Sequence, residues 1–180
     1  AQIAVTIFFV LLILLIPIIV IVSFLGIIIT LLSGFAAAVD NTDYASGSGA
    51  SIVAVAVQEI GYHEGAGNHT KYGVYTGTDG MSWCHAFVSW CANECGFIES
   101  NIIPKTAACE TGRQWFIHKQ QYQKAGSYTP QAGDIIYFDK GGVGESHHVG
   151  IVEYVENGIV HTIEGNKNNQ VMRGHYELTY

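Results

Sequence analysis

The pattern of hydrophobic and polar positions divides the chain at Asp40. Residues 1–39 contain no charged side chain and no histidine, and all 8 Lys and Arg and all 15 Asp and Glu follow them. A helix of about 20 apolar residues crosses the roughly 30 Å hydrocarbon core of a membrane. The apolar run from Ile3 to Phe35 is longer than that, so we predict one tilted transmembrane helix, kinked at Pro17.

A secretory signal peptide, cut after Ala36-Ala37-Ala38, is the competing interpretation of this run. Signal peptides begin with a basic region and have an apolar stretch of about 7–15 residues. This run has no basic residue and is longer, so a retained anchor fits the sequence better. No Lys or Arg flanks the run, so its charge does not mark the orientation of the anchor.

The remainder of the chain has the composition of a linker followed by one domain. Residues 40–50 are small, polar and rich in Gly and Ser, which is typical of a flexible linker. Residues 51–180 are long enough to enclose one hydrophobic core. The net charge of −7 lies wholly beyond residue 39. An acidic domain gains little from polyanions, so we expect no nucleic-acid partner.

The first half of this domain has the periodicity of helices. Ser51 can cap a helix to about Ile60, and residues 62–80 are glycine-rich and irregular. Ser82 is a candidate N-cap for a second helix over 83–95. A third helix is predicted from Thr106 to about Lys124.

After Pro130 the pattern changes to a period of two, which predicts strands. The expected strands are Asp134–Phe138, His148–Val155, Ile159–Glu164 and Gln170–Gly174. Helices followed by an antiparallel sheet make an α+β domain.

Cys84 is the first candidate for catalysis, because it lies in the first turn of the second predicted helix. Free N–H groups and the helix dipole stabilise a thiolate there, and the thiolate is the nucleophile of cysteine hydrolases. A buried structural cysteine is an equally good interpretation of this residue taken alone.

A thiolate nucleophile needs an imidazole that holds and returns a proton, and His148 is the best candidate. His147 and His148 point to opposite faces of the predicted strand. Val149 and Ile151 form its apolar inner face, so His148 shares the other face with Gly150. We expect Gly150 to leave room beside the imidazole for a substrate chain.

The register of the following hairpin decides which groups meet His148. A two-residue turn at Asn157-Gly158 would turn His148 away from Glu164 and Asn166. A three-residue loop, Glu156–Gly158, places His148 across from Asn166 and diagonal to Glu164. The apolar pattern favours the second register, so we predict the three-residue loop, with Glu164 or Asn166 orienting the imidazole.

The other three cysteines have no comparable partner in the sequence. Cys91 is predicted to be a small core residue. A disulfide between Cys95 and Cys109 stays open, since it depends on whether the helix end and the next loop meet.

Three ordered motifs resemble those of CHAP domains, the cysteine, histidine-dependent amidohydrolases/peptidases. The nucleophile motif is matched by residues 83–92 (WCHAFVSWCA), the histidine motif by residues 148–152 (HVGIV), and the third motif by residues 162–166 (TIEGN). Residues 131–136 (QAGDII) and 61–64 (GYHE) are also similar, and the resemblance spans roughly residues 51 to 176.

This resemblance implies a papain-like fold and cleavage of amide bonds in peptidoglycan. It implies that Cys84 is the nucleophile, that His148 is the base and acid, and that Glu164 and Asn166 orient His148. His85 departs from the family, which usually has a small or acidic residue there. No Asp-rich loop precedes Cys84, so we predict no calcium. We also predict no other metal and no cofactor.

Substrate contacts are predicted at Tyr72, Trp83, His85 and Gly150, although core packing explains Trp83 equally well. A histidine in place of Glu164 as the third group would require His161, which lies on the opposite face in the preferred register. A metal site at the histidines has no ligand spacing that we recognise.

The alternative to an enzyme is a module that binds the cell wall without cutting it, or a scaffold of a membrane complex. The anchor implies a location in the bacterial membrane with the domain on the wall side. An anchored hydrolase suits local wall opening for a secretion or conjugation machine, which is therefore an expected partner.

Overall fold

The computed structural model describes residues 49–139, 141–142 and 144–178. The predicted anchor, residues 1–39, and all but the last two residues of the predicted linker lie outside the described residues. Within the described ranges, no helix combines the length and apolar character needed to cross a membrane.

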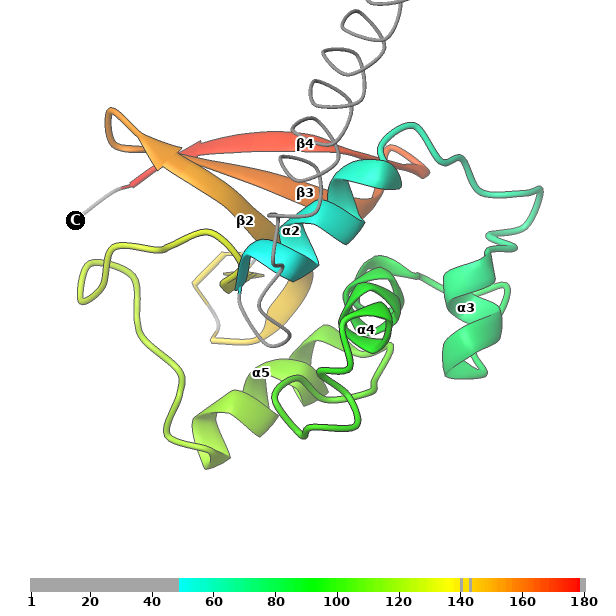
Figure 1. Ribbon diagram of the computed structural model, residues 1–180, viewed down its shortest axis with the longest axis horizontal. Helices are drawn as coiled ribbons and strands as arrows, with labels where there is room; N and C mark the ends of the chain where they lie inside the picture. The colour runs from blue at the N-terminus through cyan, green and yellow to red at the C-terminus, as the bar shows by residue number, and fades with distance from the viewer. Residues whose placement is uncertain (1–48, 140, 143, 179–180) are drawn as a thin grey trace, which may run out of the picture. The chain divides into compact units, whose positions relative to one another are not determined.

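Helices come first in the described chain and strands follow (Figure 1). The helices are α2 (Gly49–Gln58), α3 (Lys71–Thr76), α4 (Cys84–Glu94) and α5 (Cys109–His118). The strands are β1 (Ile135–Asp139), β2 (Ser146–Glu156), β3 (Ile159–Lys167) and β4 (Gln170–Glu177). The strands form one antiparallel sheet in the order β1-β2-β3-β4. The predicted α+β class is therefore confirmed.

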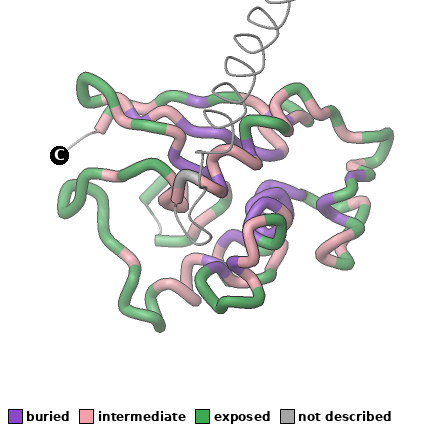
Figure 2. Tube along the Cα trace, viewed as in Figure 1, coloured by how far each residue is buried: buried purple, intermediate pink, exposed green. Residues whose placement is uncertain are grey.

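Helix α4 is the centre of the core and packs against β2 and β3. It is buried along most of its length, as are the central parts of the two strands (Figure 2). Phe87 and Val88 of α4 are fully buried with Ile151 and Ile163. Burial of one such side chain contributes about 1.5–3 kcal/mol, so this packing fixes the start of α4 against the sheet.

The helix boundaries differ from the predictions in four places. Helix α2 begins at Gly49, so Ser51 lies inside the helix and the prediction of Ser51 as its cap was wrong. Helix α3 falls in the segment predicted to be irregular. Its cap is Thr70, whose side chain accepts a hydrogen bond from the Gly73 N–H, and it ends at Gly77 with φ 75°. Helix α4 begins at Trp83 as N-cap without a side-chain cap bond, so the prediction of Ser82 as the cap was wrong. Helix α5 is shorter than predicted at both ends.

The β2–β3 hairpin has a two-residue loop, so the predicted three-residue loop is wrong. Glu156 pairs with Ile159, and Asn157 and Gly158 have φ values of 50° and 76°. These positive values are typical of the tight turn that suits strand twist.

A β-bulge between Val152 and Tyr154 shifts the pairing of β2 with β3 by one residue. The shift applies to the pairs beyond the bulge, on the side away from the turn. A bulge adds one residue to one strand and shifts every pair beyond it. Ile151 therefore pairs with Ile163, which is the register that the apolar pattern predicted. His148 and Glu164 consequently share a face, although the device that achieves this was not predicted.

Candidate active site

Cys84 is the first residue of α4 and is 6% exposed. The start of the helix is fixed by Trp83, whose indole N–H donates to Glu64 Oε2 at 2.6 Å and whose ring stacks on Tyr72 at 5.3 Å. Trp83 and Tyr72 are both fully buried. They pack in the core behind Cys84, so neither side chain is exposed for the contact with substrate that was predicted.

His148 of β2 is the imidazole that interacts with Cys84. Burial alone would lower the pKa of His148, but hydrogen bonds with Cys84 and Glu164 outweigh it and raise this pKa to about 9. A hydrogen bond from the Cys109 thiol, the interaction with His148 and the His85 backbone lower the pKa of Cys84 despite its burial. The favoured state near neutral pH is therefore a thiolate beside an imidazolium.

Glu164 of β3 orients this imidazole. Nε2 of His148 lies 2.8 Å from Glu164 Oε2, which leaves Nδ1 as the ring nitrogen for the sulfur. Glu164 was predicted to accept this hydrogen bond from the nitrogen that does not face Cys84, and the contact is present. Among the side-chain hydrogen bonds of the described residues, none joins Asn166 to His148, so the orienting role of Asn166 stays a prediction.

The Glu164 carboxylate is fully buried and has three further partners. Thr162 and Tyr176 donate their hydroxyl hydrogens to it, and the Lys167 ammonium donates at 3.0 Å and 3.1 Å. Burial would raise the pKa of Glu164, but these bonds and the one from His148 lower it to about 2. The carboxylate is therefore held ionised at the back of the site, and neither Lys167 nor Tyr176 was singled out from the sequence.

Two glycines make room for this carboxylate. A Cβ at Gly150 would lie 2.9 Å from Cγ of Glu164, and one at Gly174 would lie 1.9 Å from its Oε1. Gly150 is itself buried. The predicted role of Gly150 as space for substrate is therefore corrected: the missing side chain accommodates Glu164.

We expect Gly174→Ala to destabilise the domain by about 1–3 kcal/mol or more, because the added methyl group overpacks a buried polar cluster. The contact between Glu164 and His148 should be lost with it, since Glu164 must move away from the added methyl group. Gly65→Ala is the matched control, because its Cβ would meet no atom closer than 3.4 Å. Thermal unfolding of the two variants checks this, and equal melting temperatures would contradict it.

His85 is a buried structural residue rather than a substrate contact. Its Nδ1 lies 3.0 Å from the Thr106 carbonyl and its Nε2 lies 2.9 Å from the Tyr137 hydroxyl. These contacts fit an Nδ1–H that donates to the carbonyl and an Nε2 that accepts from the hydroxyl. Burial lowers the pKa of His85, which keeps the ring neutral. The side chain ties α4 to β1 and to the segment before α5.

The other candidate histidines lie away from this site. His147 is exposed, as the strand alternation predicted. His161 stacks on Tyr154 with ring centroids 4.2 Å apart. His161 is thus not the third group of the site. Within the described residues, no cluster of three or more His, Cys, Asp or Glu could hold a metal ion.

Cys109 is the residue of the site that the sequence reasoning missed. Its Sγ lies 3.3 Å from Cys84 Sγ, and all four cysteines are free. The sequence left a pairing of Cys109 with Cys95 open, but the contact of Cys109 is with Cys84. The sequence has no local signal for this contact, since Cys91 and Cys95 also lie in a segment predicted to be helical.

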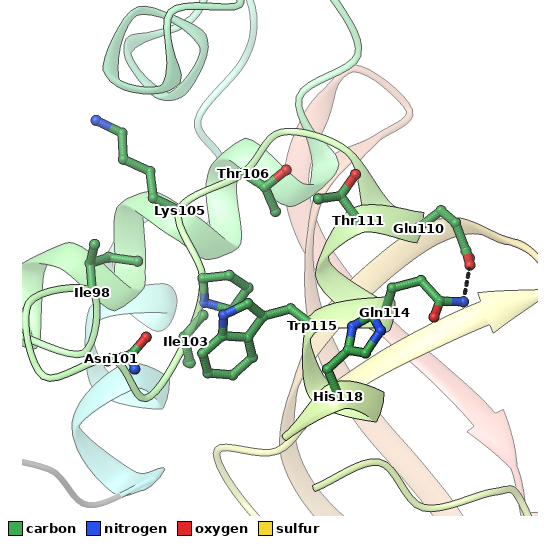
Figure 3. A pocket seen from close by; sticks show the side chains of 11 residues that line it. Ile98, Asn101, Ile103, Lys105, Thr106, Glu110, Thr111, Gln114, Trp115 and His118 are labelled. Atoms are coloured by element: carbon green, nitrogen blue, oxygen red, sulfur yellow. Dashed lines mark hydrogen bonds between the residues drawn. The ribbon is translucent and has the colours of Figure 1, made fainter. Parts of the chain in front are cut away.

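A separate pocket of about 630 Å³ lies between α5 and the segment that precedes it (Figure 3). Trp115 lies in its centre, and Glu110, Thr111, Gln114 and His118 project from α5 around it (Figure 3). None of the residues that line this pocket is Cys84, His148 or Glu164.

The ion pair predicts a characteristic dependence of Cys84 reactivity on pH. The rate of alkylation by iodoacetamide should remain high well below the ordinary thiol pKa of about 8.5, because the thiolate persists there. The thiolate–imidazolium pair itself should be lost as the pH rises through the His148 pKa of about 9, because the imidazolium then gives up its proton. An alkylation profile that follows a single ordinary thiol pKa would contradict the ion pair.

The α+β fold and the thiol, imidazole and carboxylate side chains define a cysteine- and histidine-dependent site. The sequence model of the CHAP domain matches residues 76–166, just over half of the chain. The chain therefore belongs to the CHAP domain family, as its motifs indicated. This match includes Cys84, His148 and Glu164.

One solved structure, described as the crystal structure of Ly7917, is similar to this chain with 16% sequence identity and a TM-score of 0.45. The alignment covers 73% of this chain and 57% of that chain, so this chain spans little more than half the length of Ly7917. A comparison with curated proteins finds no match.

Proposed function

We propose that this protein is a peptidoglycan hydrolase that cleaves amide bonds of the wall peptide through the Cys84 thiolate. The observation that carries this proposal is the Cys84–His148–Glu164 series, in which Glu164 contacts one ring nitrogen of His148 and leaves the other for Cys84. Membership of the CHAP family supports peptidoglycan as the substrate.

The mechanism follows from the protonation states of these groups. The Cys84 thiolate attacks the amide carbonyl carbon, and the carbonyl oxygen takes the negative charge. The backbone N–H of Cys84, which is the first residue of α4, helps to stabilise that oxyanion in this proposal. The His148 imidazolium then gives its proton to the leaving amine, which leaves a thioester on Cys84.

Water completes the reaction in the second half. Neutral His148 takes a proton from water, the hydroxide attacks the thioester, and the C–S bond breaks to restore the thiolate. The carboxylic acid product releases its proton to solvent and leaves as the carboxylate. Glu164 remains ionised throughout and stabilises the imidazolium each time that it forms. Asn166 is retained in the proposal as a second orienting group.

The bond cleaved is either the sugar–peptide amide or a bond within the peptide, and digestion of purified peptidoglycan tests both. Residues 40–180 should release fragments with new amine and carboxyl termini, which mass spectrometry assigns to one bond. Cys84→Ala should release none. Equal products from both proteins would overturn the proposal, and binding of peptidoglycan without products from either would favour the wall-binding module.

We also propose that residues 1–39 anchor the hydrolase in the bacterial membrane with its domain on the wall side, where it opens the wall locally for a secretion or conjugation machine. The support is the uncharged apolar run and the known location of peptidoglycan. Fractionation of cells that express the full chain tests this. Recovery of the full chain in the culture medium rather than in the membrane would contradict it.

A further inference from the structure

The site contains one thiol more than the proposed hydrolysis uses. Cys84 is the first residue of α4 and Cys109 is the first residue of α5, and the two sulfur atoms are 3.3 Å apart. Both side chains are buried, at 6% and 7% exposure. The contact with Cys84, together with burial, raises the pKa of Cys109, which therefore remains a protonated thiol beside the Cys84 thiolate.

Hydrogen bonds fix the segment before α5 to α4, and this docking holds the two thiols in contact. Ser89 Oγ donates to the Thr106 carbonyl at 2.7 Å and accepts from the Thr106 N–H at 3.0 Å. The His85 ring contacts the same carbonyl. A Cβ at Gly112 would lie 2.0 Å from His85 Nε2, which shows how closely α5 approaches α4. The buried His85 and Ser89 side chains therefore hold this segment against α4.

We propose that Cys84 and Cys109 form a reversible disulfide under oxidation by peroxide, and that this disulfide switches the hydrolase off. A disulfide requires an S–S distance of about 2.05 Å, so the sulfurs must approach by little more than about 1 Å. Since Cys84 is the nucleophile, its capture in the bond removes all hydrolysis. The loss of activity rests on the proposed function, whereas formation of the bond does not.

The chemistry balances with hydrogen peroxide as the oxidant. The Cys84 thiolate attacks one peroxide oxygen, which gives a Cys84 sulfenic acid and hydroxide. The Cys109 thiol then loses its proton and attacks the sulfenic sulfur, and the S–S bond forms as water leaves. A small dithiol reverses the step by exchange and is itself oxidised. Without Cys109 the sulfenic acid oxidises further to a sulfinic acid that a dithiol does not restore.

The test uses the full chain in detergent micelles, treated with hydrogen peroxide and then with dithiothreitol. Non-reducing peptide mapping should find a peptide pair joined through Cys84 and Cys109 after peroxide and not after dithiothreitol. Hydrolysis should be lost with peroxide and largely regained with dithiothreitol. Mapping that shows no such pair, or a pair through another cysteine, overturns the proposal.

Two variants separate the disulfide from general oxidation, each compared with its own untreated activity. Cys109→Ser keeps a hydrogen-bond donor beside Cys84 but cannot form the bond, so its peroxide inactivation should not be reversed by dithiothreitol. Cys95→Ser should recover like the wild type. Full recovery of Cys109→Ser overturns the proposal.

The mapping also separates this proposal from the proposed function. A mapped Cys84–Cys109 pair in a protein that releases no fragments would leave the disulfide standing and refute hydrolysis. Hydrolysis that peroxide leaves unchanged would leave the proposed function standing and refute the disulfide switch.

Discussion

Replacing His148 with alanine is expected to slow wall hydrolysis by about 10²–10⁴-fold, the usual contribution of a positioned acid and base. The variant loses the proton donor for the leaving amine. It also loses the imidazolium that helps to lower the pKa of Cys84. The rate of fragment release from purified peptidoglycan measures the first effect, and the pH profile of Cys84 alkylation measures the second.

The neighbouring residue supplies the control for this prediction. His147 is the same residue type on the same strand, but it is exposed on the other face. His147→Ala should keep the wild-type rate and the wild-type alkylation profile. If the two variants behaved alike, His148 would not be the acid and base, and the face assignment of β2 would lose its functional meaning.

The position of His148 shows both what the sequence could predict and why one step failed. The alternation of Val149 and Ile151 with His148 and Gly150 determined which side chains face the core, because a strand has a fixed period of two. The total register of the hairpin followed from matching apolar faces. The loop length did not, since a bulge on β2 shifts the register as effectively as a longer loop does.

The bulge itself has little signal in the sequence. The extra residue is Glu153, whose carboxylate forms a bidentate pair with Arg173 of β4 at 2.7 Å for each bond. Glu153 and Arg173 are 20 residues apart, so their pairing becomes visible only once β4 is placed beside β3. The two-residue turn at Asn157-Gly158, which was rejected in favour of a three-residue loop, is the turn that the structure contains.

Burial explains the other differences between prediction and structure. Tyr72, Trp83 and His85 were predicted to contact substrate because aromatic and polar side chains near a nucleophile often do. Each side chain is instead buried and has a half-buried partner for its polar atom: Glu59, Glu64 and Tyr137 respectively. Those partners come from separate elements of the fold, and a single sequence does not show which side chains meet across elements.

The contact between Cys84 and Cys109 was missed for the same reason. The two residues lie 25 positions apart at the starts of different helices. Only the docking of α5 beside α4 brings them together. The approach of Cys84, His148 and Glu164 to one another was predictable because each lies in a local motif with a clear strand or helix position.

Replacing Glu164 with glutamine is expected to lower hydrolysis by about 10²–10⁴-fold, with little change of shape. The neutral amide no longer stabilises the His148 imidazolium, and removal of the buried carboxylate from a catalytic triad has effects of this size. The Cys84 alkylation profile should move toward higher pH in the variant. Glu156→Gln, on the exposed end of the hairpin, is the control and should leave both measurements unchanged.

Stability gives an independent reading of the same substitution. The Glu164 carboxylate accepts from His148, Thr162, Tyr176 and Lys167, and the glutamine amide nitrogen would face some of these donors with no acceptor to offer. Leaving buried polar groups unpaired in this way costs about 1–3 kcal/mol each. We therefore expect Glu164→Gln to unfold at a lower temperature at neutral pH.

The pH dependence of that loss has a definite sign. The folded pKa of Glu164, about 2, lies below the ordinary glutamate value of about 4.3. The ionised group therefore stabilises the wild type fully above pH 4.3, and this contribution disappears as the pH falls through 2. The stability difference between wild type and Glu164→Gln should shrink over the same range. If Glu164→Gln kept the wild-type rate of hydrolysis while Asn166→Ala lost it, the orienting role would belong to Asn166 rather than to Glu164.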